Sequence, residues 1–236
     1  MFLRRLVPVF AIVFCGSLAL AAAAVAAGGG MSPGQYSFTN HSADAFFGMG
    51  SKGGPPAPSW SVTVNQGLNS FRPKHPSSPA IVDDSTVVYV TEFDALGNGG
   101  HGCFVVPDSS FTVSRDLKTA ALHATLTSDE ICDGYAGPVG GAKDIVLAGG
   151  EGGLDLPIRV DVTWSATSAV STNKDVFSFR CLNATTDGNS TYQSVIASAT
   201  GTISALDGPF TSEFSDVSAG STQLNVHNVP PDACFA

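Results

Sequence analysis

The strongest constraint on the fold is a strict alternation of apolar and polar residues between Leu156 and Ala166. From Ile158 onward, every second residue is apolar and the residues between them are polar. Successive side chains of a strand point to opposite faces, so this period of two predicts a strand with one buried face and one face in water. Trp164 belongs to the apolar set, and we expect it in the core.

The same signal recurs in shorter pieces along the chain. Phe177, Phe179 and Cys181 alternate with Ser178, Arg180 and Leu182. A set of small residues between Val195 and Ile203, including Gly201, indicates close approach of a facing strand or of a bulky partner. Hairpins are expected at 87–106 and 111–126. No segment shows a capped apolar stripe of helical period. About nine to eleven short strands predict an antiparallel two-sheet β-sandwich, with a β-barrel as the alternative.

Four segments, taken in order, carry a resemblance to a family. They are Phe111-Thr112-Val113-Ser114, Asp116 to Ala120, Val160 to Trp164 and Ala199 to Ile203. Together they resemble a group of uncharacterised exported bacterial β-sandwich-like proteins, over residues 105–205. The shared features are strands and turns, so the resemblance implies fold and secretion and implies no catalytic residue or ligand.

Residues 1–27 have the layout of a secretory signal peptide. Arg4 and Arg5 precede an apolar run at 6–20, and small residues lead up to Ala27. The alternative is an uncleaved anchor, because 6–27 is long enough to cross a bilayer of about 30 Å. No second apolar span follows. We therefore expect a secreted, extracellular protein with a flexible lead-in at 28–34, a single domain at 35–236 and no membrane span after signal removal.

The charge balance excludes some classes of partner. The formal net charge is −9, and without residues 1–27, which hold two arginines and no acids, nine basic residues face twenty acidic ones for a net charge of −11. Such a surface repels nucleic acids and anionic lipids. Only 13% of residues are charged, which is typical of a β protein with uncharged polar faces.

Four cysteines follow the leader, at Cys103, Cys132, Cys181 and Cys234. An even number in an exported chain implies disulfides. Four cysteines allow three pairings, and we predict Cys103 with Cys132 and Cys181 with Cys234, which join neighbours in the sequence. No pair has the spacing of zinc ligands, which argues against a metal site there.

Acidic and amide side chains gather in two expected turns and suggest a calcium ion held by oxygen ligands. The pair Asp83 and Asp84 is a further acidic cluster of this kind, and for every cluster the alternative is that Asp and Asn are simply favoured in turns. The candidate calcium ligands are Asp94, Asn98, Asp129, Glu130 and Asp133. Trp60, which follows several prolines, is a candidate for stacking on a sugar ring; half-buried packing is the alternative.

No catalytic motif is present in the chain. The sequence has no Gly-x-Ser-x-Gly, and the glycine-rich stretch around Lys52 lacks the order of a phosphate-binding loop. Serine hydrolase triads are recognised by geometry, so five histidines stay open as bases, with His123 expected on a solvated strand face. These are His41, His75, His101, His123 and His227.

Taken together, these features favour a secreted protein without enzymatic chemistry. We expect an extracellular binding module or a surface-associated structural module, with an extracellular ligand or a cell-surface component as its partner. A carbohydrate-binding module is a narrower form of this hypothesis. The alternative from another class is a secreted hydrolase whose site is assembled from loops.

Overall fold

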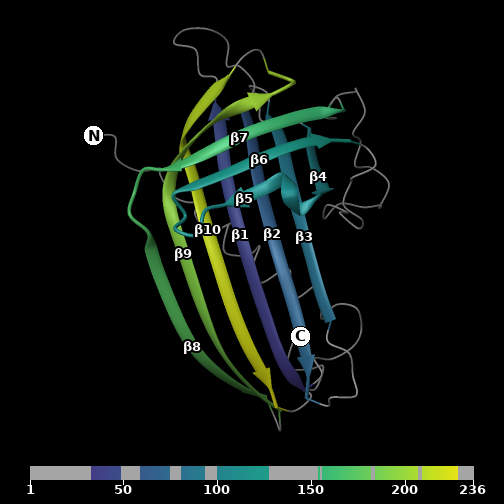
Figure 1. Cartoon of the computed structure of the whole chain (residues 1–236), viewed down its shortest axis with the longest axis vertical. Coiled ribbons are helices and arrows are strands. Elements are labelled where there is room, and N and C mark those ends of the chain that lie inside the picture. Colours follow the sequence, from purple (N-terminus) through teal and green to yellow (C-terminus); the bar gives the residue numbers. More distant parts are fainter. Residues whose placement is uncertain are drawn as a thin grey trace, which may run out of the picture.

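The computed structural model describes residues 33–48, 59–74, 81–93, 100–127, 154, 156–181, 184–206 and 209–227. These residues form ten strands and one short 3₁₀ turn, η1 (Figure 1). In chain order the elements are β1 (Gly34–Gly48), β2 (Ser59–Pro73), β3 (Ile81–Phe93), β4 (His101–Val106), η1 (Asp108–Ser110), β5 (Phe111–Val113), β6 (Thr119–Leu126), β7 (Ile158–Ala166), β8 (Ser171–Cys181), β9 (Ala184–Ile203) and β10 (Phe210–Val226).

All ten strands belong to one antiparallel sheet in the order β4-β3-β2-β1-β10-β9-β7-β6-β5, with β8 also paired to β9. The prediction of an all-β antiparallel fold is confirmed, as are the hairpins β3–β4 and β5–β6. The two-sheet sandwich is not confirmed, because one continuous hydrogen-bonded sheet curls into a half-barrel. Its two end strands, β4 and β5, are separated in sequence only by residues 107–110. The curl is closer to the barrel alternative.

The sheet forks along one edge of β9. Residues 197–203 of β9 pair with β7, whereas residues 184–194 pair with β8. At the fork, the Ile196 carbonyl accepts hydrogen bonds from the amides of Thr167 and Ser168 at 2.8 and 3.2 Å. The Ile196 amide in turn donates to the Ser168 hydroxyl at 2.9 Å. These bonds fix the segment between β7 and β8 to the backbone of β9, and from this point β7 runs in a different direction from β8.

The swing carries β5, β6 and β7 across one end of the long strands (Figure 1). The hydrophobic core lies between these two parts of the curled sheet, and we call the core side of the sheet its inner face and the other side its outer face. Trp164 is fully buried, as predicted; its indole nitrogen donates to the Asp44 carbonyl at 2.8 Å, and its ring meets Phe111 edge-on. The long strands contribute to the core Ala43, Ala45, Phe47, Trp60, Val62, Val64, Val88, Val90, Val195, Ala197, Ala199, Ile203 and Val217.

The other end of the long strands has no covering layer among the described elements (Figure 1). We call this part the open half; it comprises residues 34–42, 65–73, 81–85, 171–181, 184–194 and 219–226. A polar network marks its border with the core. There the buried Thr86 hydroxyl donates to Asp108 at 2.6 Å, and the Gln66 amide donates to the Thr86 hydroxyl at 3.2 Å.

Aromatic contacts on the outer face hold the open half together. Tyr36 and Phe71, paired across β1 and β2, stack with ring centroids 4.4 Å apart. On the other side, a Cβ atom at Gly188 of β9 would collide with the ring of Phe177 from β8 and with Leu224 from β10. The missing side chain lets the Phe177 ring lie against the β9 backbone, which fixes β8 to its neighbour. Phe177 therefore packs on the outer face and is not part of the core.

Cys103 on β4 is buried and disulfide-bonded. The predicted disulfides join Cys103 to Cys132 and Cys181 to Cys234. Because Cys132 and Cys234 lie outside the described residues, both pairings stay predictions. The expected signal peptide at 1–27 and lead-in at 28–34 lie almost entirely outside them as well. Within the described part of the chain, no helix is long and apolar enough to cross a membrane.

Gly201 tests the close approach predicted from the small residues of β9. A Cβ atom there would meet the backbone of Asp161 and Val162 on β7. We expect Gly201→Ala to lower the free energy of unfolding by about 1–3 kcal/mol, because the packed strands must shift. Chemical denaturation measures this. The matched control is Gly67→Ala on β2, where a Cβ atom would meet nothing. Equal stability of the two variants would contradict the close contact.

Candidate functional site

The inner face of the open half carries a field of uncharged polar side chains. Its registers bring residues from distant parts of the sequence side by side. Ser37 on β1 pairs with Gln223 on β10, which pairs with Asn189 on β9. Among the described residues, the side chains of these three residues have no hydrogen-bond partner within the protein. Their donors and acceptors are therefore available to a ligand.

The polar field extends over the four central strands β2, β1, β10 and β9. Four strands at the usual spacing span about 15 Å, and seven residues of one strand span about 20 Å. The only large apolar side chain on this central area is Leu68. The Ser, Thr, Asn and Gln residues of the area are Gln35, Ser37, Thr39, Gln66, Ser70, Asn189, Thr191, Gln193, Ser221, Gln223 and Asn225.

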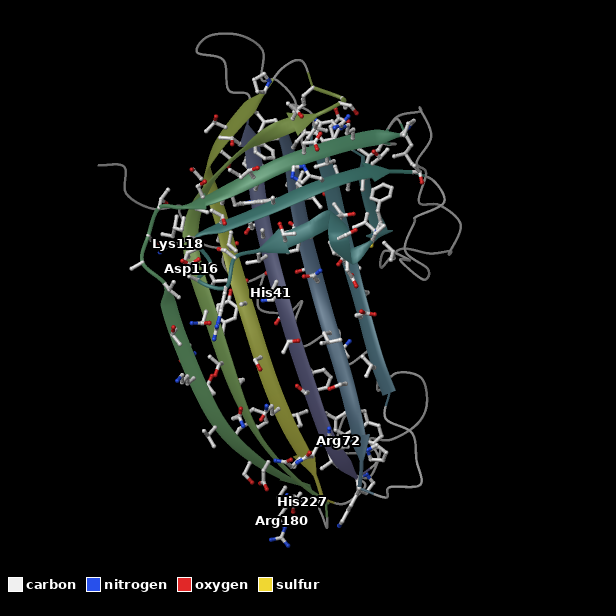
Figure 2. The ribbon with its side chains drawn as sticks, viewed as in Figure 1. His41, Arg72, Asp116, Lys118, Arg180 and His227 are labelled. Atoms are coloured by element: carbon white, nitrogen blue, oxygen red, sulfur yellow. The ribbon has the colours of Figure 1, made fainter. Side chains whose placement is uncertain are left out.

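Charged side chains on this face lie at its periphery. Asp84 is on β3 and Lys174 on β8, at the two lateral edges of the open half. Arg72 and Arg180 are at its far end, where Figure 2 also places His227, whereas His41 lies between the polar field and the crossing strands. The arrangement is a neutral centre with a charged rim.

The far end of the face contains a hydrogen-bonded cluster around Asp187. One carboxylate oxygen accepts from the Ser178 hydroxyl at 2.8 Å, and the other lies 2.8 Å from Nε2 of His227. The hydrogen bond to His227, followed by that from Ser178, lowers the pKa of Asp187 below its usual value. Asp187 is thus an anion at neutral pH whose oxygens are already engaged.

A second histidine and carboxylate pair lies elsewhere, on the outer face of β6 and β7. Nδ1 of His123 is 3.0 Å from one oxygen of Asp161, and Nε of Arg159 donates to the other at 2.8 Å. The hydrogen bond to His123 is the main cause of a lowered Asp161 pKa, with Arg159 contributing. Arg159 and Asp161 line a shallow hollow of about 390 Å³ together with residues 202–204 and Leu206. His123 is exposed, as expected from the sequence.

Neither cluster has the geometry of a serine hydrolase. In a triad the imidazole lies between the nucleophile and the carboxylate. Around Asp187 the carboxylate is the central group, and the Ser178 hydroxyl contacts it instead of His227. Near Asp161, the Ser204 hydroxyl accepts from the Arg159 amide at 3.0 Å. Within the described part of the chain, no contact joins a hydroxyl nucleophile to either imidazole.

Of the ligand-binding residues predicted from the sequence, the structure describes Trp60 and none of the candidate calcium ligands. Trp60 is 2% exposed in the core, so its ring offers no surface on which a sugar can stack. Its register with Val62 and Val64 was the signal for burial, and it outweighs the preceding prolines. The candidate calcium ligands Asp94, Asn98, Asp129, Glu130 and Asp133 lie outside the described residues. The described residues contain no group of three or more side chains able to hold a metal ion.

Comparison of the chain with protein-family models, with curated proteins and with solved structures gave no significant match.

Two aspartates with opposite pKa shifts predict opposite responses to pH. Burial raises the pKa of Asp216, on β10, so its ionisation destabilises the folded state. The protonated Asp216 carboxyl is favoured in the folded state, and the stability that this gives is present at acid pH and is lost as pH rises through the pKa of Asp216 in the folded protein. We expect Asp216→Asn to raise the melting temperature near pH 7 and to lose this advantage as pH falls through that pKa.

Asp116 provides the comparison for this measurement. Hydrogen bonds from Lys118 lower its pKa to about 2, so the carboxylate is favoured in the folded state and any stability it adds is lost only in strong acid. Because this pair is exposed, Asp116→Asn should change the melting temperature little, and downward, at neutral pH. Melting curves for both variants across the acid range test the raised pKa of Asp216 against the lowered pKa of Asp116. An effect of Asp216→Asn that does not change with pH would contradict the raised pKa.

Proposed function

We propose that this protein is a non-enzymatic carbohydrate-binding protein that takes a neutral polysaccharide chain on the inner face of its open half. The observation that carries this proposal is the neutral polar centre on β2, β1, β10 and β9. Hydroxyl and amide side chains supply both donors and acceptors, which match the hydroxyl groups of sugars. The area is long enough for several sugar rings of an extended chain.

The composition of this face favours a sugar over a protein partner. The buried centres of protein interfaces are enriched in aromatic residues, Met and Arg and are depleted in Ser. The centre of the inner face, away from Arg72 and Arg180 at its far end, has the reverse composition. Its central strands carry serine, threonine and amide side chains, while the aromatic rings of Tyr36, Phe71 and Phe177 lie on the outer face.

The charge distribution favours a neutral polysaccharide over an anionic one. The whole chain has a net charge of −9, which repels polyanions at long range. The cations on the inner face, Arg72, Lys174 and Arg180, stand at its far end and edge and not at its centre. An anionic ligand on the centre would lose hydration of its charges without gaining a cation as partner, whereas a neutral ligand has no such loss.

An extracellular location completes the proposal. The arginine pair, apolar run and small residues of 1–27 support export, and polysaccharides are abundant outside cells. A protein of this kind would act as a binding module or as a structural component at a surface. It needs no catalytic group for either task.

The amides at the centre of the face provide the direct test. Gln223 and Asn189 face one another across β10 and β9. We expect the double substitution Gln223→Ala with Asn189→Ala to weaken polysaccharide binding about thirtyfold, since each of the two lost hydrogen bonds contributes about 1 kcal/mol. Affinity electrophoresis in gels containing glucan, mannan or xylan measures the change, and an anionic pectin gel tests the preference for neutral chains.

The matched control uses the same two strands on the opposite face. Thr222 and Ser190 also pair across β10 and β9, but they belong to the outer face. Replacing both with alanine should leave mobility in every gel unchanged. Failure of the wild-type protein to bind any of the neutral polysaccharides would overturn the proposal, and so would equal losses from the inner-face and outer-face variants.

A further inference from the structure

The lateral edge of the open half is formed by β8. This strand of eleven residues pairs on one side with β9, and no described strand pairs with its other side. Its described side chains are all exposed. Val176, at its midpoint, is 89% exposed, more than any other large hydrophobic residue of the described chain.

Natural edge strands avoid pairing with other chains by being short, bulged or interrupted by proline, or by carrying charged side chains, lysine above all. Strand β8 is long and regular and has no proline; its charged residues are Lys174, Asp175 and Arg180, and their effect depends on the residues that they would face. Its sequence from Ser171 to Cys181 contains neither proline nor glycine, and its register with β9 is regular throughout. The packing of Phe177 against Gly188 holds it in place. The edge is therefore an ordered row of backbone donors and acceptors.

We propose that β8 pairs antiparallel with β8 of a second copy of this chain, around a twofold axis that passes through Val176. Residues directly opposite one another in an antiparallel pair point to the same face of the sheet. Neighbouring residues of a strand point to opposite faces, so a twofold axis cannot pair a residue with its neighbour in the other copy. The axis must therefore pass through a residue that lies opposite its own copy. Centring it on Val176 pairs all eleven residues of the strand. It also brings the two exposed Val176 side chains into contact.

The charges of β8 distinguish this register from its neighbours. A pairing centred on Lys174 or on Asp175 places a charged residue opposite its own copy, and one centred on Phe177 places Lys174 opposite Arg180. Like charges in direct opposition destabilise a strand pair. Registers centred farther from the midpoint leave several residues unpaired. The register centred on Val176 avoids both costs.

The same register provides a partner for the lysine. Lys174 lies opposite Ser178 of the second copy, on the inner face. Ser178 hydrogen-bonds Asp187, its register partner on β9, so an anionic carboxylate lies in the same row as Lys174, two strand spacings or about 10 Å away between Cα atoms, a gap that the long lysine side chain can span. The pair of chains thus gains opposite charges on each side of the axis, and the inner faces of the two open halves join into one surface.

Molar mass measured by light scattering over a range of protein concentrations tests the proposal. We expect the wild-type protein to form a dimer. Val176→Lys, which puts two ammonium groups together on the axis, should weaken the dimer at least about tenfold. Its effect on the monomer should be small because Val176 is exposed, and the melting temperature checks this. The control, Val82→Lys, alters a 66% exposed valine on β3 at the opposite edge, and it should leave the dimer intact.

Cysteine cross-linking tests the register independently. In Val176→Cys the two new thiols face one another, so oxidation by dissolved oxygen, which takes up their electrons and protons, should link the copies. In Lys174→Cys the thiols lie about 13 Å apart along the strands and should not link. A wild-type protein that stays monomeric, a dimer broken by Val82→Lys and not by Val176→Lys, or a link at 174 in place of 176 would each overturn the proposal.

Discussion

The fork of the sheet at Ile196 determines the shape of the described structure. The strands β7 and β8 both pair with the same edge of the long strand β9. They diverge because the segment at Thr167 and Ser168 is hydrogen-bonded to the backbone of Ile196. A strand that left β9 without this fork would extend the sheet along its whole length. The fork instead sends β7, and with it β6 and β5, over one end of the inner face.

That division explains the distribution of apolar residues along the long strands. In β2, Trp60, Val62 and Val64 occupy the covered end, and the same face continues with Gln66, Leu68, Ser70 and Arg72, of which only Leu68 is apolar. An antiparallel sheet can leave one face in water if that face is polar. In the open half, the inner face meets this condition, and the outer face gains its cohesion from rings such as Tyr36 and Phe71.

The sequence predicted those features that depend on local period. Alternation was sufficient for the β7 strand, for the burial of Trp164 and for the exposure of His123. It was insufficient to distinguish a sandwich from a single curled sheet, because that difference depends on which strands pair. The polar face was missed for the same reason. Ser37, Gln223 and Asn189 are unremarkable in the sequence and become neighbours only through the registers of β1, β10 and β9.

A polar face of this kind has a physical consequence for binding. Each hydrogen bond to a ligand replaces one to water, so its net contribution is only about 1 kcal/mol. Weak contacts of this size give useful affinity when many act on one long ligand, and a repeating polymer presents the same groups along its length. Joining two copies along β8 extends the field, and the second site then meets the same chain at high effective concentration. The proposed polysaccharide face and the proposed dimer edge would therefore serve the same end, which is retention of an extended ligand without any single strong contact.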